Sequence, residues 1–287
     1  MKFKLNGFEK FIIKKHKAMR IVACIFLFIA FFSYNYRVVL GSALILLALA
    51  FYFYVCMLPS LKNLKLTKLN NIEMNLDAFI NGANLMIEAT NPKDLSNITT
   101  FCINRIIALI NMGEFDRAEN ELRLFWQTFD LKKIPAGVLA DTHIAMANIA
   151  LEKGDMKAFN DQMNLVYQYR KNAQGFAILK NALDYSINGI HLFAEAVTAD
   201  EHRNENDYEA RVFAHLNTNP INNKPRKKAP QPMYVVSAYG KLFEFFKHTG
   251  NIEKATYYAQ QLINIGNEQI IDYRKAKEYL ENANRSN

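Results

Sequence analysis

The sequence predicts an all-α protein with an N-terminal transmembrane helical hairpin followed by a superhelix of α-hairpins. Three observations support this fold class. Residues 21–33 and 38–58 are apolar stretches without an acidic or basic residue, and four residues separate them. After residue 58, glycine and proline are sparse and apolar residues recur at helical spacing. Three glycine-containing turns then divide much of this region into pairs of helices.

The stretch 38–58 is long enough to cross a bilayer as a helix. Its 21 residues span about 31 Å, which matches a hydrocarbon core of about 30 Å. The alternative is a buried helix of a soluble domain. Residues 21–36 span only about 24 Å, and either Arg20 extends this helix by lifting its charge to the headgroups or the bilayer thins locally. A cleaved signal peptide and a wedge that does not cross the bilayer are the alternatives for this first stretch.

Basic residues predict the orientation of the hairpin. Seven of them and a single acid, Glu9, lie in residues 1–20, which we expect to form a basic cytoplasmic arm. Three lysines follow the second stretch, whereas Arg37 is the single charge in the turn. The excess on one side places both termini and the soluble region in the cytoplasm, with residues 21–58 in the cell membrane. The basic residues are Lys2, Lys4, Lys10, Lys14, Lys15, Lys17, Arg20, Lys62, Lys65 and Lys68.

The charge distribution argues against a nucleic-acid partner. The chain has a net charge of +8, but residues 1–20 contribute +6 and Arg37 one more, so the region from residue 59 onward is close to neutral. Such a region has no overall field to attract nucleic acid. We expect the bases at positions 2–20 to contact anionic lipid instead. The cysteines Cys24, Cys56 and Cys102 are predicted to be reduced and buried.

The region after the membrane stretches divides into a membrane-proximal segment, 59–92, and a helical domain, 93–287. Leucines predict a helix that leaves the membrane and continues to about residue 89, where Asn91-Pro92 ends it. A long helix is predicted over residues 173–199. The polar segment 200–232 is predicted to be a flexible loop, with a short helix at 208–216.

Three turns in the helical domain share one pattern. Each has a glycine that ends one helix through a positive φ, an apolar residue two positions later that plugs the top of the hairpin, and a small or apolar residue in the next helix. A small residue there allows two helices to approach closely. The turn residues are Gly113, Phe115 and Ala118, then Gly154 and Met156, and finally Gly250, Ile252 and Ala255.

These turns resemble the tetratricopeptide repeat family. The last unit matches best, through Tyr239, Leu242, Gly250, Ala255, Ala259 and Leu262, whereas the first unit departs at Arg105 and Ile106. The distances between the glycines, 41 and 96 residues, differ from the family's repeat of about 34 residues. The resemblance implies a degenerate helical-repeat scaffold that binds a peptide or a helix of a protein partner.

Motifs for chemistry are absent from the sequence. None of the six histidines lies in a metal-binding motif, and no glycine-rich phosphate loop or nucleophile motif is present. We therefore predict no catalytic, metal or cofactor site. Candidate contacts with a partner or with lipid are Trp126, which alternatively packs between hairpins, and a basic cluster, which alternatively is a solvated loop. The cluster consists of Lys224, Arg226, Lys227 and Lys228.

These observations predict a membrane-anchored cytoplasmic adaptor that binds or scaffolds a protein partner. An alternative is an accessory subunit of a transporter or synthase, which contacts that complex through the hairpin. Its small residues would allow close helix packing in the bilayer, namely Gly41, Ser42, Ala43, Ala48 and Ala50. An enzyme without recognisable motifs is a third possibility, and a pocket with convergent polar groups and a shifted titratable residue would favour it.

Overall fold

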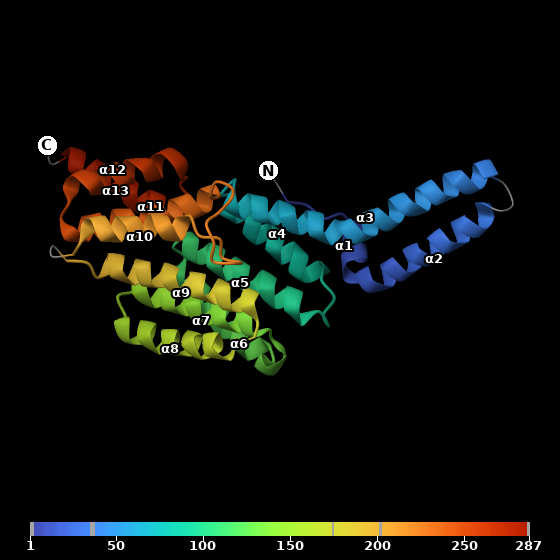
Figure 1. Ribbon diagram of the computed structural model, residues 1–287, viewed down its shortest axis with the longest axis horizontal. Helices are drawn as coiled ribbons and strands as arrows, with labels where there is room; N and C mark the ends of the chain where they lie inside the picture. Colours follow the sequence, from blue (N-terminus) through green and yellow to red (C-terminus); the bar gives the residue numbers. More distant parts are fainter. Residues whose placement is uncertain (1–2, 35–37, 174, 201–202, 286–287) are drawn as a thin grey trace.

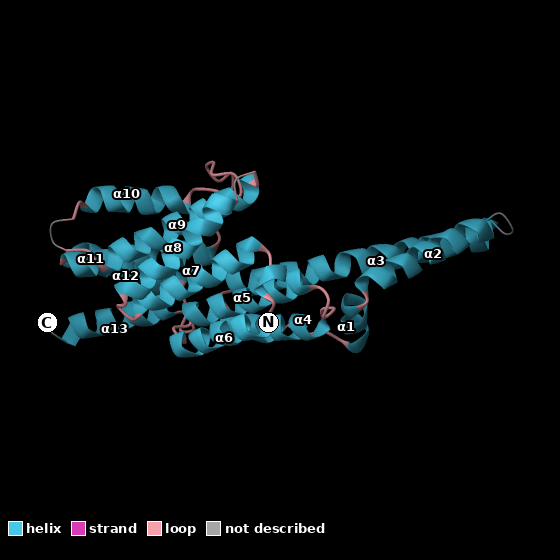
Figure 2. Cartoon of the chain, turned by 90° about the horizontal axis from the view of Figure 1, so that it is seen from below, coloured by secondary structure: helices cyan, strands magenta, loops and turns pink. Residues whose placement is uncertain are grey.

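The chain folds into a helical body from which a long two-helix arm projects (Figures 1 and 2). The computed structural model describes residues 3–34, 38–173, 175–200 and 203–285. Across these residues all regular structure is helical, so the prediction of an all-α fold is confirmed. The helices are α1 (Gly7–Lys14), α2 (His16–Tyr34), α3 (Val38–Asn71), α4 (Leu76–Ala89), α5 (Leu95–Asn111), α6 (Phe115–Thr128), α7 (Ala136–Glu152), α8 (Met156–Asn172), α9 (Ala177–Val197), α10 (Glu205–Leu216), α11 (Pro232–Thr249), α12 (Ile252–Ile265) and α13 (Ile271–Arg285), with a short 3₁₀ helix at Leu131–Lys133.

The arm consists of α2 and the first part of α3, which pack against each other in opposite directions. Alanines lie at this contact, since Ala23, Ala30 and Ala48 are at most 1% exposed. Large apolar side chains point outward, as Phe28 and Leu46 do at 65% and 68% exposure. Small residues on the inside let the helices approach closely and leave the bulky side chains on the outer surface.

One helix among the described residues, Ser42–Asn71, is long and apolar enough to cross a membrane. Only 17% of its most apolar part is buried. A core helix of a soluble protein would be mostly buried, so this helix does not fit that alternative.

The helix expected from residue 59 to about 89 is wrong in its bounds. The helix α3 continues through Pro59 to Asn71, and a break then separates it from α4. At the break Met74 has a φ of 49°, and its carbonyl accepts a hydrogen bond from Asn267 Nδ2 at 3.0 Å. Gln269 Oε1 accepts from the backbone N–H of Leu76 at 2.7 Å, so residues from the other end of the chain hold this break in place.

Helical hairpins form much of the body. The pairs α5–α6, α7–α8 and α11–α12 are each joined at a glycine with positive φ, which is 70° at Gly113, 71° at Gly154 and 77° at Gly250. Asp155 and Asn251 then cap the helices that follow the second and third glycines by accepting hydrogen bonds from backbone N–H groups. The turns therefore combine a residue that ends one helix with a residue that begins the next.

The C-terminal helix α13 closes the body by contacting the turns of the first two hairpins. Arg274 Nη2 donates to the carbonyl of Met112 at 2.6 Å, and Lys275 Nζ lies 2.9 Å from Glu152 Oε2. The helix also packs against α11 and α12. The two ends of the helical domain are thereby in contact, which encloses the space between its helices.

Candidate functional site

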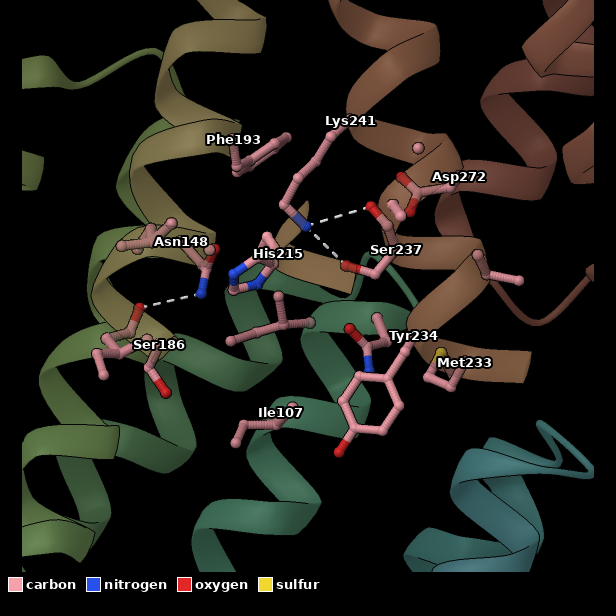
Figure 3. A pocket seen from close by; sticks show the side chains of 18 of the residues that line it. Ile107, Asn148, Ser186, Phe193, His215, Met233, Tyr234, Ser237, Lys241 and Asp272 are labelled. Carbon is pink, nitrogen blue, oxygen red and sulfur yellow. Dashed lines mark hydrogen bonds between the residues drawn. The ribbon is translucent and has the colours of Figure 1, made fainter. Parts of the chain in front are cut away.

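A cavity of about 330 Å³ lies inside the body, between α5, α7, α9, α10, α11 and the start of α13 (Figure 3). Branched and aromatic side chains form most of its wall. On α7, the lining residues recur at helical spacing, from Asp141 through Asn148 to Glu152, so one face of this helix borders the cavity. Apolar lining residues include Ile107, Ile110, Ile144, Ile190, Phe193 and Val212.

Lys241 on α11 supplies a positive charge to the cavity. Its Nζ donates to the carbonyl of Ser237 at 3.2 Å and lies 2.8 Å from Ser237 Oγ (Figure 3). Both bonds are made within one turn of the same helix. Burial lowers the pKa of Lys241 to about 8, although the nearby carboxyl group of Asp272 opposes this shift. An ammonium has three donors, so one remains for another acceptor.

Asp272, at the start of α13, lies beside α11 (Figure 3), close to Gly240. A methyl group at Gly240 would lie 2.5 Å from Asp272 Oδ2, so glycine leaves the space that the carboxyl group occupies. Burial raises the pKa of Asp272 to about 6, and the positive charges of Lys275 and Lys241 oppose that shift. No ion pair within 4.0 Å joins Lys241 to Asp272.

Asp141 on α7 is the second carboxyl group that lines the cavity. Burial alone raises the pKa of Asp141 to about 6, without an opposing effect from a positive charge. Within the described part of the chain, its carboxyl group has neither a hydrogen bond nor an ion pair. The Asp141 side chain is only partly buried, so its unpaired carboxyl group is accessible from the cavity.

A histidine and a tyrosine stack at the border of the cavity. The rings of His215 and Tyr185 are 4.1 Å apart, and burial, followed by repulsion from Lys241 and Arg226, lowers the pKa of His215 to about 4. The imidazole is therefore neutral at pH 7. Arg226 Nη2 donates to the Tyr185 hydroxyl at 3.3 Å, and its guanidinium lies 4.7 Å from the ring centre of Tyr234.

A chain of ion pairs lies next to the cavity and involves Glu152 in its wall. Lys275 Nζ is 2.9 Å from Glu152 Oε2 and 3.4 Å from Glu244 Oε1, and Lys247 Nζ is 2.6 Å from Glu244 Oε2. Only 4% of the Glu244 side chain is exposed. The ion pair with Lys275 neutralises the Glu152 carboxylate, whereas the Asp141 carboxyl group has no such ion pair.

A second functional feature lies where the arm joins the body. The short helix α1 begins with a capping box between Asn6 and Glu9 and exposes Phe8 and Phe11. The ring of Phe8 stacks with Tyr54 of α3 at 6.4 Å, and Glu9 Oε1 lies 2.7 Å from Lys62 Nζ. Aromatic and basic side chains of α1 are thus fixed beside the inner end of the apolar stretch. This combination is typical of the membrane–water interface.

The turn residues predicted from the sequence differ in how deeply they are buried. Ala118 and Ala255 are fully buried and Phe115 is half-buried, but Met156 and Ile252 are 38% and 71% exposed. Met156 and Ile252 are each the first residue of a helix and are more exposed than Phe115. None of these turn residues lines the cavity.

Trp126 packs between helices instead of standing free on the surface. Its indole Nε1 donates to Thr142 Oγ1 at 3.3 Å, and its ring stacks on His143 at 5.8 Å. Thr142 is fully buried. The packing alternative for Trp126 therefore fits the structure better than an exposed anchor.

The basic cluster divides into an inward residue and three surface lysines. Arg226 is half-buried, and its Nε donates to the carbonyl of Leu216 at 2.9 Å, whereas Lys224, Lys227 and Lys228 are exposed. The segment around them contains α10 at the place of the short helix predicted for 208–216, and it continues into a turn closed by backbone hydrogen bonds such as Asn219 N–H to Lys224 O at 2.8 Å.

Sequence inspection missed Asp141, Lys241 and Asp272, because they lie on three helices far apart in the chain. A weak signal was present for Asp141 and Lys241, which each occur among apolar residues. No group of three histidine, cysteine or acidic side chains within the described ranges is arranged to hold a metal ion. Comparisons with protein-family models, curated proteins and solved structures find no match.

Proposed function

We propose that the protein is a membrane-anchored cytoplasmic helical-repeat adaptor that binds a protein partner at the membrane. The observation that carries this proposal is the continuity of α3. Its 34 residues extend about 51 Å, whereas a hydrocarbon core is about 30 Å thick. The outer part is an apolar arm and the inner part packs against α4 and α11 in the body. One helix thus connects a lipid-compatible surface to a folded domain without a flexible linker.

In this proposal α2 and α3 both cross the bilayer, with both termini in the cytoplasm. The outward aromatic and aliphatic side chains of the arm suit a lipid environment, and Lys62, Lys65 and Lys68 follow it on α3. The helix α1 supports the same orientation, since its exposed phenylalanines and lysines lie at the inner end of the arm.

A patch of exposed apolar and basic side chains on the body is the proposed contact with the protein partner. Phe176 and Ile178, at the start of α9, are 69% and 68% exposed, and Ile221 is 58% exposed. Asn181, one turn after Ile178, donates to the carbonyl of Ile221 at 3.0 Å, which places the two isoleucines near each other. Lys224 follows in the same turn. A partner helix with apolar and acidic side chains would complement this patch.

Affinity purification from native membranes in a mild detergent tests the adaptor function. The intact protein should recover a stoichiometric partner, and the double variant Phe176→Glu/Ile178→Glu should lose it. A matched control is Ile252→Glu, because Ile252 is equally exposed but begins α12. A protein that remains alone under these conditions, or a partner retained by the double variant, contradicts the proposal.

The alternative accessory-subunit function has less support from the structure. Ala48, one of its proposed contact residues, is fully buried inside the arm, whereas Ala43 and Ala50 remain exposed. Replacing residues 21–58 with an unrelated two-span hairpin distinguishes the two functions. A retained partner supports the body as the binding element, and a lost partner supports the arm.

A further inference from the structure

Three charged side chains border the central cavity without a complete set of partners. Lys241 donates both of its hydrogen bonds to Ser237, and no ion pair within 4.0 Å joins it to Asp272. Asp141 has neither a hydrogen bond nor an ion pair with any of the described residues. All three positions lie on different helices of the cavity wall. All three side chains are only partly buried, so their unpaired polar atoms remain accessible to a ligand in the cavity.

We propose that the cavity binds a small zwitterionic molecule, the size of an amino acid or a dipeptide, whose ammonium group pairs with Asp141 and whose carboxylate pairs with Lys241. This inference goes beyond the adaptor function and does not depend on the partner or on the membrane arm.

The charges of the wall favour this class of ligand over simpler ones. Glu152 is neutralised by Lys275, so the unmatched groups are two carboxyls and one ammonium. An inorganic anion would be repelled by Asp141 and Asp272, and a simple cation would leave Lys241 unmatched. A ligand with both charges pairs with Asp141 and with Lys241, and Asp272 remains near the positive charge of Lys241. Its ammonium neutralises Asp141, which has no cation of its own, and its carboxylate accepts the remaining donor of Lys241.

The size and walls of the cavity fit the body of such a ligand. A volume of about 330 Å³ is at the lower end for ligand sites. Phe193 lies on the wall beside Lys241 and His215, and Ile107 lies at the far end of the cavity (Figure 3), so an apolar side chain of the ligand would pack along this wall. Asn148 and Ser186 add neutral polar groups on the side opposite Ser237. Few polar groups in an apolar wall are typical of sites that fix a ligand's orientation.

Calorimetric titration of the full-length protein in detergent tests this proposal with defined probes. The probes are the twenty free amino acids, leucyl-leucine and phenylalanyl-leucine, and for each probe that binds, its N-acetyl and its C-terminal amide forms. We expect at least one zwitterion to bind in the millimolar range or tighter. Its N-acetyl form and its C-terminal amide form should each bind at least about tenfold more weakly, because each lacks one of the two charges. This comparison uses the unaltered protein, so it does not depend on the folding of a variant.

Two substitutions test which protein side chain pairs with each charge of the ligand. Asp141→Asn should remove the preference for the free ammonium, and Lys241→Met should remove the preference for the free carboxylate. Asp116→Asn and Lys227→Met, which change exposed residues, should leave both preferences intact. The proposal is overturned if no zwitterion in the panel binds, if the blocked forms bind equally well, or if the folded cavity variants keep both preferences. Loss of the protein partner in the purification experiment would not affect this outcome.

Discussion

Asp141 illustrates how a single buried charge links stability to pH. Its ordinary pKa is 3.8, and burial raises the pKa in the folded protein to about 6. The folded state therefore binds this proton more tightly than the unfolded state. The stabilising contribution is fully present below pH 4 and is lost as the pH rises through about 6.

We expect Asp141→Asn to stabilise the ligand-free protein at pH 7.5 by about 1–3 kcal/mol, because the amide removes a charge that is costly to bury. The gain should shrink toward zero at pH 4.5, where the wild-type carboxyl group is protonated. Thermal unfolding of both proteins across this pH range measures the difference. Asp116→Asn is the control, since 92% of that side chain is exposed. A gain that does not depend on pH would contradict the assigned burial of Asp141.

Sequence reasoning could not place Asp141, Lys241 and Asp272 together. Periodicity identifies a residue's helix, but it does not determine which helices meet across an interior cavity. The same limit applies to Trp126, whose hydrogen bond to Thr142 depends on the packing of α6 against α7. Arg226 was expected at the surface because its neighbours are lysines, yet Tyr185, Tyr234 and the carbonyl of Leu216 hold it inward.

At the scale of elements, glycine turns were the most informative local signal. Gly113, Gly154 and Gly250 each combine positive φ with the end of a helix, which a sequence pattern can reveal. The break at Met74 had no such signal, because Asn267 and Gln269 determine it from almost two hundred residues away. For this reason the turns could be predicted, whereas the division between α3 and α4 could not.

The turns at Gly113 and Gly154 provide a matched comparison. Both have a φ near 70°, but a methyl group at Gly154 would meet open space, whereas one at Gly113 would lie 2.6 Å from Ile271 Cδ1. We expect Gly154→Ala to cost about 1 kcal/mol of unfolding free energy from backbone strain. Gly113→Ala should cost about 1 kcal/mol more, because the end of the Ile271 side chain must also move away. Chemical denaturation measures both, and equal losses would argue against the close contact of α13 with the first turn.

At the scale of the whole molecule, α13 joins the two ends of the helical domain. Lys275 on this helix is the cation between Glu152 of α7 and Glu244 of α11. The resemblance to a repeat family predicted a superhelix of α-hairpins, but it did not predict the contacts that α13 makes with the earlier helices. The closure depends on contacts between α13 and the earlier helices, and it leaves an interior cavity where the charges accumulate.

We expect Lys275→Met to destabilise the protein by about 2–4 kcal/mol, since it leaves Glu152 without this ion pair and Glu244 with a weaker set of partners. Lys277→Met is the matched control on the same helix. Lys277 pairs with Glu268, whose side chain is 77% exposed, so its loss should change stability by less than about 1 kcal/mol. Similar effects of the two substitutions, measured by urea unfolding, would contradict a structural role for the buried ion pairs.

The membrane orientation of the arm is the central claim for the whole molecule, and labelling of single cysteines in intact cells tests it most directly. In a protein without its three native cysteines, Asn35→Cys lies between the two apolar stretches of the sequence and Asp116→Cys lies on α6 of the body. A maleimide that cannot cross membranes should label position 35 in intact cells and position 116 only after the cells are opened. Protection of position 35, or labelling of position 116 from outside, would contradict a two-span anchor with a cytoplasmic body.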